Sequence, residues 1–177
     1  MRAVSFFVSV SADGMIARED GSADWILSDQ DYGFESFFEK VDTLLMGRKT
    51  FEQILSQGPW PFEDKTTYVF SRTLGNRFGP NVQVINRDPA TFVEELKEEE
   101  GGRIWLAGGA QLARSLMAEN LVDDVTLNIH SEMLGEGIEL YPLPLHSMFW
   151  ELKDSKEFNS GLVQVRYRLK ASEISFD

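Results

Sequence analysis

Short apolar runs alternate along the chain with segments in which apolar residues recur every three or four positions. The runs are rich in Val, Ile and Phe, as strands are, whereas the periodic segments present the single apolar face of a helix. The first helix is expected to carry its apolar positions from Phe34 to Val41. The alternation of strands with helices predicts an α/β fold. The expected strands span residues 4–11, 43–46, 66–70, 82–85, 104–107 and 125–129, and the expected helices start near Asp31, Arg48, Pro89 and Gly109.

The last part of the chain has a different pattern. Residues 149–152 and 162–169 flank the turn signal Asn159-Ser160-Gly161, and the second run alternates apolar with polar positions, which is typical of an antiparallel hairpin. We therefore expect a three-layer α/β sandwich whose central sheet is mostly parallel and ends in an antiparallel C-terminal hairpin. Ligands of such sheets bind beyond the carboxyl ends of the strands. Since no repeat or linker divides the chain, residues 1–177 are interpreted as a single domain.

Composition narrows the choice of partners. Seventeen Lys and Arg against 29 Asp and Glu give a net charge of −12, which repels the phosphates of nucleic acid. No apolar run approaches the roughly 20 residues of a membrane helix, and the first residues do not form a signal peptide. The absence of cysteine excludes a disulfide framework and suits a reducing compartment. We therefore expect a cytoplasmic protein that acts on a small molecule and contacts neither nucleic acid nor membrane.

Three segments place glycine or a cation where an expected strand ends. The segment Gly47–Thr50 combines a helix N-terminus with two cations, which would suit a phosphate. Gly108-Gly109 would let a pyrophosphate rest on the helix that follows, and Ser71-Arg72 would hold a terminal phosphate with a guanidinium fork. The alternative for each segment is an ordinary turn with solvated side chains. The Gly-x-Gly-x-x-Gly and Gly-Lys-Ser/Thr motifs are absent, so a dinucleotide would bind in a different arrangement.

Asp31 is the acid that the pattern singles out, because it lies on the core side of the first expected helix. A partly buried carboxylate there would have a raised pKa and could anchor or protonate a nitrogen heterocycle. The alternative is a carboxylate that caps the helix. His130 and His146 lie 16 positions apart and no carboxylates have the spacing of metal ligands. We therefore expect no metal site and assign both histidines to the structure.

Six short motifs follow one another along most of the chain. They are Ser11–Ala17, Gly21–Trp25, Thr43–Phe51, Gly108-Gly109, Leu134–Ile138 and Leu140–Pro142. Each is weak by itself, but in this order and at this spacing they resemble the dihydrofolate reductase superfamily. Within it, they are most similar to the branch that contains the reductase domain of riboflavin biosynthesis and its bacterial single-domain relatives.

The resemblance implies a sheet flanked by helices, NADPH across the strand ends, and hydride transfer to a pyrimidine or pterin-like substrate. The nearest named reaction is that of 5-amino-6-(5-phosphoribosylamino)uracil reductase, and dihydrofolate reduction is the second. A module that binds NADP(H) without catalysis is a further hypothesis. Relatives in this branch often pair, and the apolar alternation near the carboxyl terminus offers an edge, so we also expect a homodimer.

The resemblance also assigns residues to the cofactor. Three side chains would meet the adenosine phosphates, Ser71 would lie beside the 2′-phosphate, and residues 108–111 would pass close to the pyrophosphate. The three side chains are Arg48, Thr50 and Arg72. The whole cofactor set is Ala12, Ile16, Gly47, Arg48, Lys49, Thr50, Ser71, Arg72, Gly108, Gly109, Ala110 and Gln111.

The candidates for catalysis and substrate binding depart in two ways from the family pattern. Gln30 falls where the folate enzyme has its acid, and Asp31 lies one step beyond. The segment 34–42 offers Lys40 among three acids, whereas the riboflavin branch usually carries basic residues there for a ribose phosphate. The catalytic candidates are Asp31, Gln30 and Trp25, and the substrate-binding candidates are Phe34, Glu35 and Asn128.

Overall fold

The computed structural model describes residues 1–75 and 78–170. The strands are β1 (Val4–Ser11), β2 (Met15–Ala17), β3 (Val41–Gly47), β4 (Thr66–Phe70), β5 (Val82–Ile85), β6 (Arg103–Gly108), β7 (Asp124–His130), β8 (Ile138–Glu139), β9 (Trp150–Glu157) and β10 (Val163–Leu169). The helices are α1 (Phe34–Phe38), α2 (Arg48–Ser56), α3 (Pro89–Glu98) and α4 (Ala110–Ala118).

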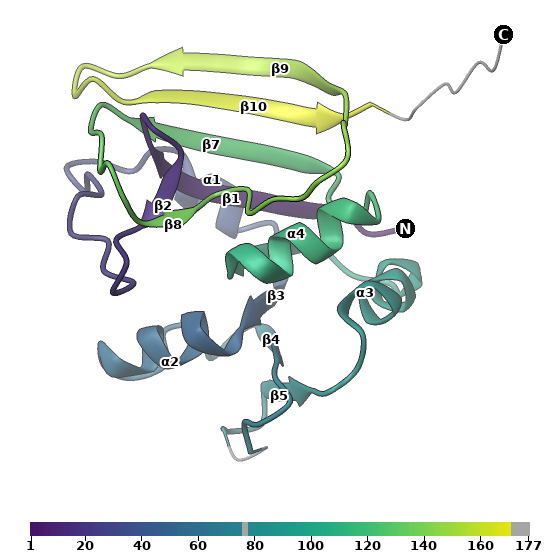
Figure 1. The fold of residues 1–177 in the computed structure, drawn as a ribbon. Coiled ribbons are helices and arrows are strands. Elements are labelled where there is room, and N and C mark those ends of the chain that lie inside the picture. The colour runs from purple at the N-terminus through teal and green to yellow at the C-terminus, as the bar shows by residue number, and fades with distance from the viewer. Residues whose placement is uncertain (76–77, 171–177) are drawn as a thin grey trace, which may run out of the picture.

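The central sheet has eight strands in the order β5-β4-β3-β6-β1-β7-β10-β9 (Figure 1). All neighbours from β5 to β7 pair in parallel, and β10 pairs antiparallel with both β7 and β9. β2 and β8 form a separate two-stranded antiparallel sheet. The expected α/β fold, mostly parallel and closed by an antiparallel C-terminal hairpin, is confirmed.

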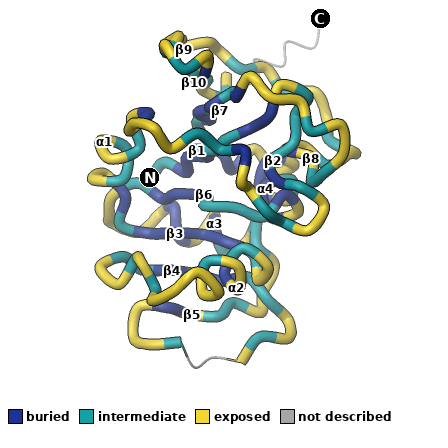
Figure 2. The backbone as a smooth tube through the Cα atoms, turned by 90° about the vertical axis from the view of Figure 1, so that its left-hand side faces the viewer, coloured by how far each residue is buried: buried dark blue, intermediate teal, exposed yellow. Residues whose placement is uncertain are grey.

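Two apolar clusters hold helices to the two faces of the sheet, because successive strand side chains point to opposite faces. On one face, Phe51 of α2 packs with Leu44 and Met46, and the phenylalanines of α1 join them. On the other face, α3 and α4 pack against Leu45 and its neighbours. Figure 1 shows α4 in front of the sheet and α1 behind it, and Figure 2 shows the central strands buried along most of their length.

α1 is shorter than its periodicity predicts. Val41 was expected in the helix, but it opens β3 with 2% of its surface exposed and pairs with Arg103. A spacing of three and four residues ending at position 41 fits either a helix or the first buried position of a strand. The Asp42 carboxylate decides between them, since it accepts a hydrogen bond from Gly102 N and pairs with Arg2, which ties this segment to the sheet.

β9 is longer than expected, since the sequence pattern predicted a strand over residues 149–152 only. Beyond Leu152 it carries Lys153, Asp154 and Lys156, which do not alternate with apolar residues. The strand continues because β10 supplies backbone partners as far as Glu157. None of the helices in the described part of the chain has the length and apolarity that a membrane crossing needs.

Candidate functional site

The carboxyl ends of β3 and β6 lie side by side at the switch point of the sheet, where the connections after adjacent strands go to opposite faces. The two strands are neighbours, with Met46 paired to Gly108. The chain leaves β3 through α2 on one face and leaves β6 through α4 on the other face. Diverging connections of this kind open a crevice between two helix N-termini, which is where open α/β sheets bind ligands.

Glycines allow these two helix starts to approach each other. A Cβ on Gly109 would lie 3.4 Å from Gly47 N, and a Cβ on Gly108 would lie 3.0 Å from Thr50 Cγ2. Gly109 also has a φ of 98°, which side-chain-bearing residues rarely adopt. Gly47 and Gly109 are the N-caps of α2 and α4, and neither helix has a side-chain cap or an acid in its first turn. Their first amides therefore remain available for an anion.

Cations border the same edge of the sheet. Arg48 and Lys49 open α2 and are exposed, and Arg48 has only a 3.5 Å exposed contact with Glu52. β4 lies next to β3 with Phe70 paired to Gly47, so Ser71 and Arg72 follow at the same level. Arg72 forms no ion pair with the residues that the structure describes. The structure thus brings together the three segments that the sequence singled out for phosphate.

Other members of the predicted cofactor set contribute in different ways. Ser71 Oγ accepts hydrogen bonds from Thr73 N and Leu74 N, so it stabilises the turn in which Arg72 lies. Ala110 is 9% exposed and offers its backbone, whereas the Gln111 side chain is exposed in the first turn of α4. Gly47, Gly108 and Gly109 form a glycine cradle between the two uncapped helix starts. Together with Lys49 and Arg72, which form no ion pair with the described residues, this cradle fits the phosphates of a dinucleotide.

The loop after β1 holds the next candidates and is anchored by Asp13. Ala12 N donates to Glu132 O, while Ile16 packs against the cluster that includes α4. Asp13 accepts hydrogen bonds from Ser11 Oγ, from Leu134 N and from Gly135 N. These bonds, that from Ser11 first, lower the pKa of Asp13 to about 2 from an ordinary 3.8. The carboxylate therefore joins the β1 loop to the segment before β8.

This anchor predicts a pH dependence. Because the folded pKa of Asp13 lies below that of the unfolded chain, its contribution is complete above about pH 4 and is lost as the pH falls toward 2. We expect the amide protons of Leu134 and Gly135 to shift with a midpoint near 2 in an NMR titration. A midpoint near 3.8 for both amides would contradict the anchor.

Trp25 and His130 form a buried pair behind this loop. Trp25 is 6% exposed and His130 is 2% exposed, and their rings meet edge to face at 5.2 Å. Leu27 N donates to His130 Nδ1 at 3.4 Å, and burial lowers the pKa of the imidazole. The ring is therefore neutral with its proton on Nε2. Trp25 Nε1 and His130 Nε2 are closed to solvent and have no hydrogen-bond partner among the described residues, so two polar atoms remain unsatisfied behind the loop.

The acid candidates lie on the outside of the next segment. Asp31 is exposed and accepts hydrogen bonds from Gly33 N, Phe34 N and Glu35 N at 3.2, 2.8 and 3.1 Å. Gln30 is also exposed, and its amide donates to Asp29. The geometry of Asp31 is that of a carboxylate that stabilises the start of α1, which is the alternative the sequence left open.

Replacing Asp31 separates this structural role from a chemical one. We expect Asp31→Ala to cost about 1 kcal/mol of unfolding free energy because three amides lose their acceptor. Asp31→Asn keeps an oxygen at the same position and should cost markedly less. Urea unfolding of both variants checks this, and equal losses in the two would exclude the capping role.

The substrate candidates are spread over two environments. Phe34 packs edge to face with Phe7 at 5.6 Å and with Trp105 at 5.1 Å, while Glu35 is exposed. Asn128 is 4% exposed, and its Oδ1 accepts a 2.7 Å hydrogen bond from Gln164 Nε2. The structure therefore places Phe34 in an aromatic cluster and Asn128 in a polar network on the same face of the sheet.

Sequence reasoning did not identify two residues that complete this network. Gln164 also donates to Tyr32 O at 2.6 Å, and Tyr32 is 7% exposed with its hydroxyl bonded to Asp29 and Ser160. Burial raises the pKa of Tyr32. Tyr32 and Gln164 lie 132 positions apart, so no local pattern relates them; the strand alternation that puts Gln164 opposite Asn128 was the one available signal. Among the described residues, no group of three or more His, Asp or Glu could hold a metal ion.

Comparison with known sequences gives a family match over nearly the whole chain. The model of the RibD C-terminal domain matches residues 2–164. The uncharacterized protein YwjB of Bacillus subtilis (strain 168) is 36% identical over 94% of this chain and 97% of its own length. The uncharacterized protein YyaP of the same strain is 34% identical over 94% of each chain.

Solved structures agree with the observed fold. A protein of Shewanella sp. PV-4 attributed to riboflavin biosynthesis has a TM-score of 0.85 and 25% identity, covering 96% of this chain and 99% of its own. The bifunctional pyrimidine deaminase and uracil reductase of Thermotoga maritima has a TM-score of 0.73 and 16% identity, over 96% of this chain and 57% of its own. Dihydrofolate reductase of Enterococcus faecalis, solved with NADP(H), has a TM-score of 0.71 and 20% identity, over 96% of this chain and 97% of its own. The last two likenesses concern the fold.

Proposed function

The chain belongs to the family of the RibD C-terminal domain, and from this premise we propose that it is an NADPH-dependent reductase of a pyrimidine or pterin-like heterocycle. The family is one of reductases of riboflavin biosynthesis, which makes an oxidoreductase the fitting class. We propose that residues 1–177 act as one such domain in the cytoplasm, with the reaction of 5-amino-6-(5-phosphoribosylamino)uracil reductase as the nearest named activity.

One observation carries the cofactor assignment. Gly47 and Gly109 bring two uncapped helix N-termini together at the switch point of the sheet. Arg72, which forms no ion pair with the described residues, follows the end of the neighbouring strand. Uncapped amides stabilise the pyrophosphate, and a guanidinium fork suits a phosphomonoester. NADPH carries both groups, whereas NADH lacks the second. The dihydrofolate reductase of similar fold was solved with NADP(H), which supports the same choice.

The residues of this chain would bind, orient and shield the reactants. When bound, NADPH supplies the hydride. Gly47, Gly108 and Gly109 let the pyrophosphate approach the backbone, while Ala12 and Ile16 line the nicotinamide end of the crevice. Trp25 and His130, a buried ring pair behind the β1 loop, exclude water from that side of the crevice. Asn128, held by Gln164, presents its amide to the heterocycle.

The proposal is tested by oxidation of NADPH that depends on an acceptor. Purified protein is mixed with NADPH and, in separate reactions, with 5-amino-6-(5-phosphoribosylamino)uracil and with dihydrofolate, and the loss of NADPH absorbance is followed. Turnover with the aminopyrimidine supports the nearest named activity, and turnover with dihydrofolate alone supports the second. Tight binding of NADPH without turnover on these or any other pyrimidine, pterin or quinonoid acceptor would instead identify a module without catalysis.

The same fold offers a surface for a homodimer, which we propose as the assembly. β9 is the last strand of the sheet and has no strand on its outer side among the described residues. Phe149 is 79% exposed and Leu152 is 54% exposed, so apolar surface accompanies this free edge. Light scattering should give about twice the 20.1 kDa of the chain, and a monomer at micromolar concentration would refute the assembly.

A further inference from the structure

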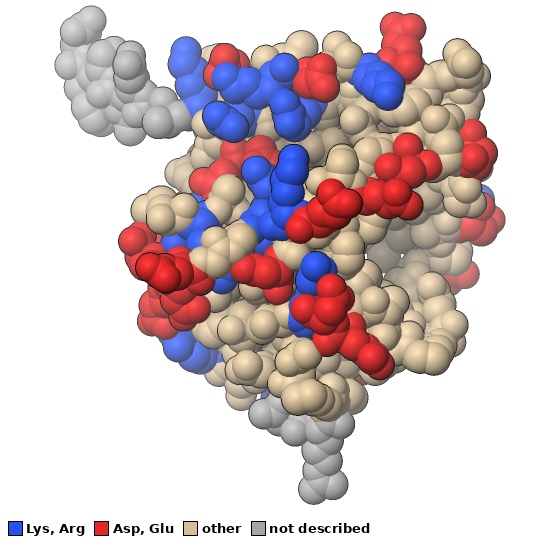
Figure 3. All heavy atoms as spheres, turned by 180° about the vertical axis from the view of Figure 1, so that it is seen from behind, with Lys and Arg blue, Asp and Glu red and all other residues tan. Residues whose placement is uncertain are grey.

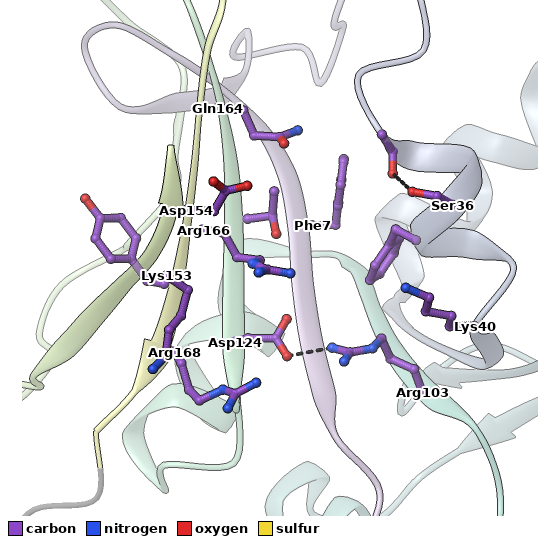
Figure 4. Close-up of a pocket in the computed structure, with 14 residues that line it drawn as sticks. Phe7, Ser36, Lys40, Arg103, Asp124, Lys153, Asp154, Gln164, Arg166 and Arg168 are labelled. Atoms are coloured by element: carbon purple, nitrogen blue, oxygen red, sulfur yellow. Dashed lines mark hydrogen bonds and ion pairs between the residues drawn. The ribbon is translucent and has the colours of Figure 1, made fainter. Parts of the chain in front are cut away.

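A cavity of about 210 Å³ opens between α1 and the C-terminal hairpin. Phe7 and Phe37 form its apolar part together with the ring of Tyr167 (Figure 4). Its polar side chains come from α1, the turn after α1, β6, β7, β9 and β10. The cations and acids that line it are Lys40, Arg103, Asp124, Lys153, Asp154, Arg166 and Arg168.

The charge of this cavity is opposite to that of the chain. Five of the 17 Lys and Arg line it, together with two carboxylates, so its formal charge is 5 − 2 = +3 in a chain of −12. Figure 3, which shows this side of the molecule, has Lys and Arg gathered over the hairpin and the strands beside it. A concentration of cations against the net charge favours an anionic ligand.

Internal pairing leaves part of this charge free. Arg103 uses its Nη1 for both Asp124, at 2.6 Å, and Ser5 Oγ, which fixes the guanidinium in place. Lys153 pairs with Glu151 at 2.6 Å, just outside the cavity, and this bond lowers the pKa of Glu151. Three cations form no ion pair within the described residues, and they are Lys40, Arg166 and Arg168.

The backbone holds two of the free guanidiniums on one face. Arg166 and Arg168 alternate along β10 and pair with Thr126 and Asp124 of β7, so both side chains leave the same side of the sheet. Residues two apart on a strand are about 7 Å apart, a separation that lets two forks converge on one anion. In Figure 4 both arginines extend toward the space that Arg103 faces from the other side.

The cavity lies away from the crevice assigned to the cofactor. Arg103 and Asp124 are the first residues of β6 and β7, whereas Gly108 and His130 are the last. His130 lies six positions beyond Asp124 along β7, which corresponds to about 20 Å. The anion held here is therefore not a phosphate of the cofactor bound between Gly47 and Gly109.

We propose that this cavity is a second anion site that binds the phosphomonoester group of a small molecule. Planar guanidiniums bind phosphate through two parallel hydrogen bonds, and Phe7 and Phe37 can pack against the carbon skeleton that carries it. The phosphate belongs either to the heterocyclic substrate, reaching down the sheet from Asn128, or to a separate molecule. The site itself does not depend on the proposed reductase function, but its assignment to the substrate does.

Binding of ribose 5-phosphate, with ribose as the neutral control, tests the site. Isothermal titration of the full chain should show saturable binding of ribose 5-phosphate that weakens with ionic strength, and no binding of ribose. Arg166→Gln should weaken binding about tenfold or more, and Arg166→Gln combined with Arg168→Gln should remove it. Lys156→Gln removes one positive charge from the same hairpin outside the cavity, so it should change the affinity less than about twofold.

The outcomes distinguish the site from the function and the two sources from each other. Equal losses in Arg166→Gln and Lys156→Gln, or equal affinity for ribose and ribose 5-phosphate, would overturn the proposal. Ribose 5-phosphate that raises the KM of an acceptor without changing kcat would assign the phosphate to the substrate. Unchanged KM and kcat would assign it to a separate molecule. If the proposed reductase function is wrong and the anion site is right, NADPH does not bind to the chain, whereas ribose 5-phosphate still binds.

Discussion

Gly109→Ala is expected to weaken NADPH binding by more than about tenfold and to cost about 1–3 kcal/mol of unfolding free energy. The new Cβ would stand 3.4 Å from Gly47 N, at a φ of 98° that alanine rarely adopts. To relieve the close contact and the backbone strain, the start of α4 must move away from the start of α2. The two sets of amides would then no longer face one pyrophosphate. Fluorescence titration and thermal unfolding measure the two effects.

Gly58→Ala is the matched control for this prediction. Gly58 has a φ of 143°, a Cβ there would meet nothing within 4 Å, and the residue follows the far end of α2. We expect this variant to lose stability from backbone strain while it keeps the NADPH affinity of the wild type. If Gly109→Ala also kept that affinity at a comparable loss of stability, the glycine cradle would not be the pyrophosphate site.

Arg72→Ala is expected to weaken NADPH binding about 10- to 100-fold and to leave NADH binding unchanged. A charge-assisted hydrogen bond contributes about 1.5–3 kcal/mol, and Arg72 has no competing ion pair in the described chain. Because NADH lacks the 2′-phosphate, the Arg72 guanidinium has no phosphate to bind in the NADH complex, and its removal should not change the affinity for NADH.

The control for Arg72 is Arg87→Ala, which removes an exposed arginine of the same surface type. Arg87 pairs with Glu95 at 2.7 Å and lies beside Phe92, so it should not affect either nucleotide. Dissociation constants for both nucleotides, measured at one salt concentration, give the comparison. If Arg72→Ala weakened the binding of NADPH and of NADH equally, Arg72 would not contact the 2′-phosphate.

The sequence pattern predicted an element correctly where the spacing of its apolar residues fits only one type of secondary structure. β4 and β5 begin and end where their apolar runs do, because short runs between turn signals are strands of that length. Val41 was misplaced because its spacing fits a helix as well as a strand, and a distant Asp42–Gly102 contact decided the outcome. β9 was predicted too short because its pairing with β10, rather than its own composition, extends it.

The candidate site shows the same division. Gly47, Arg72 and Gly109 could be found from sequence because each lies at or within two residues of the end of a strand, and parallel strands bring their ends to one edge. The Trp25–His130 pair could not be found, since a ring contact across 105 positions leaves no periodic trace. The cationic cavity is also invisible in the sequence, because Lys40 was the one cation of its segment and its partners come from β6, β9 and β10.

The crevice between α2 and α4 is expected to bind NADPH in preference to NADH. The most direct test is a titration of the wild-type chain with each nucleotide, followed by quenching of its four tryptophans, with the shift in melting temperature as a second readout. We expect saturable quenching by NADPH at concentrations at least about tenfold below those needed for NADH. Equal affinity for the two nucleotides, or binding of neither, would contradict it.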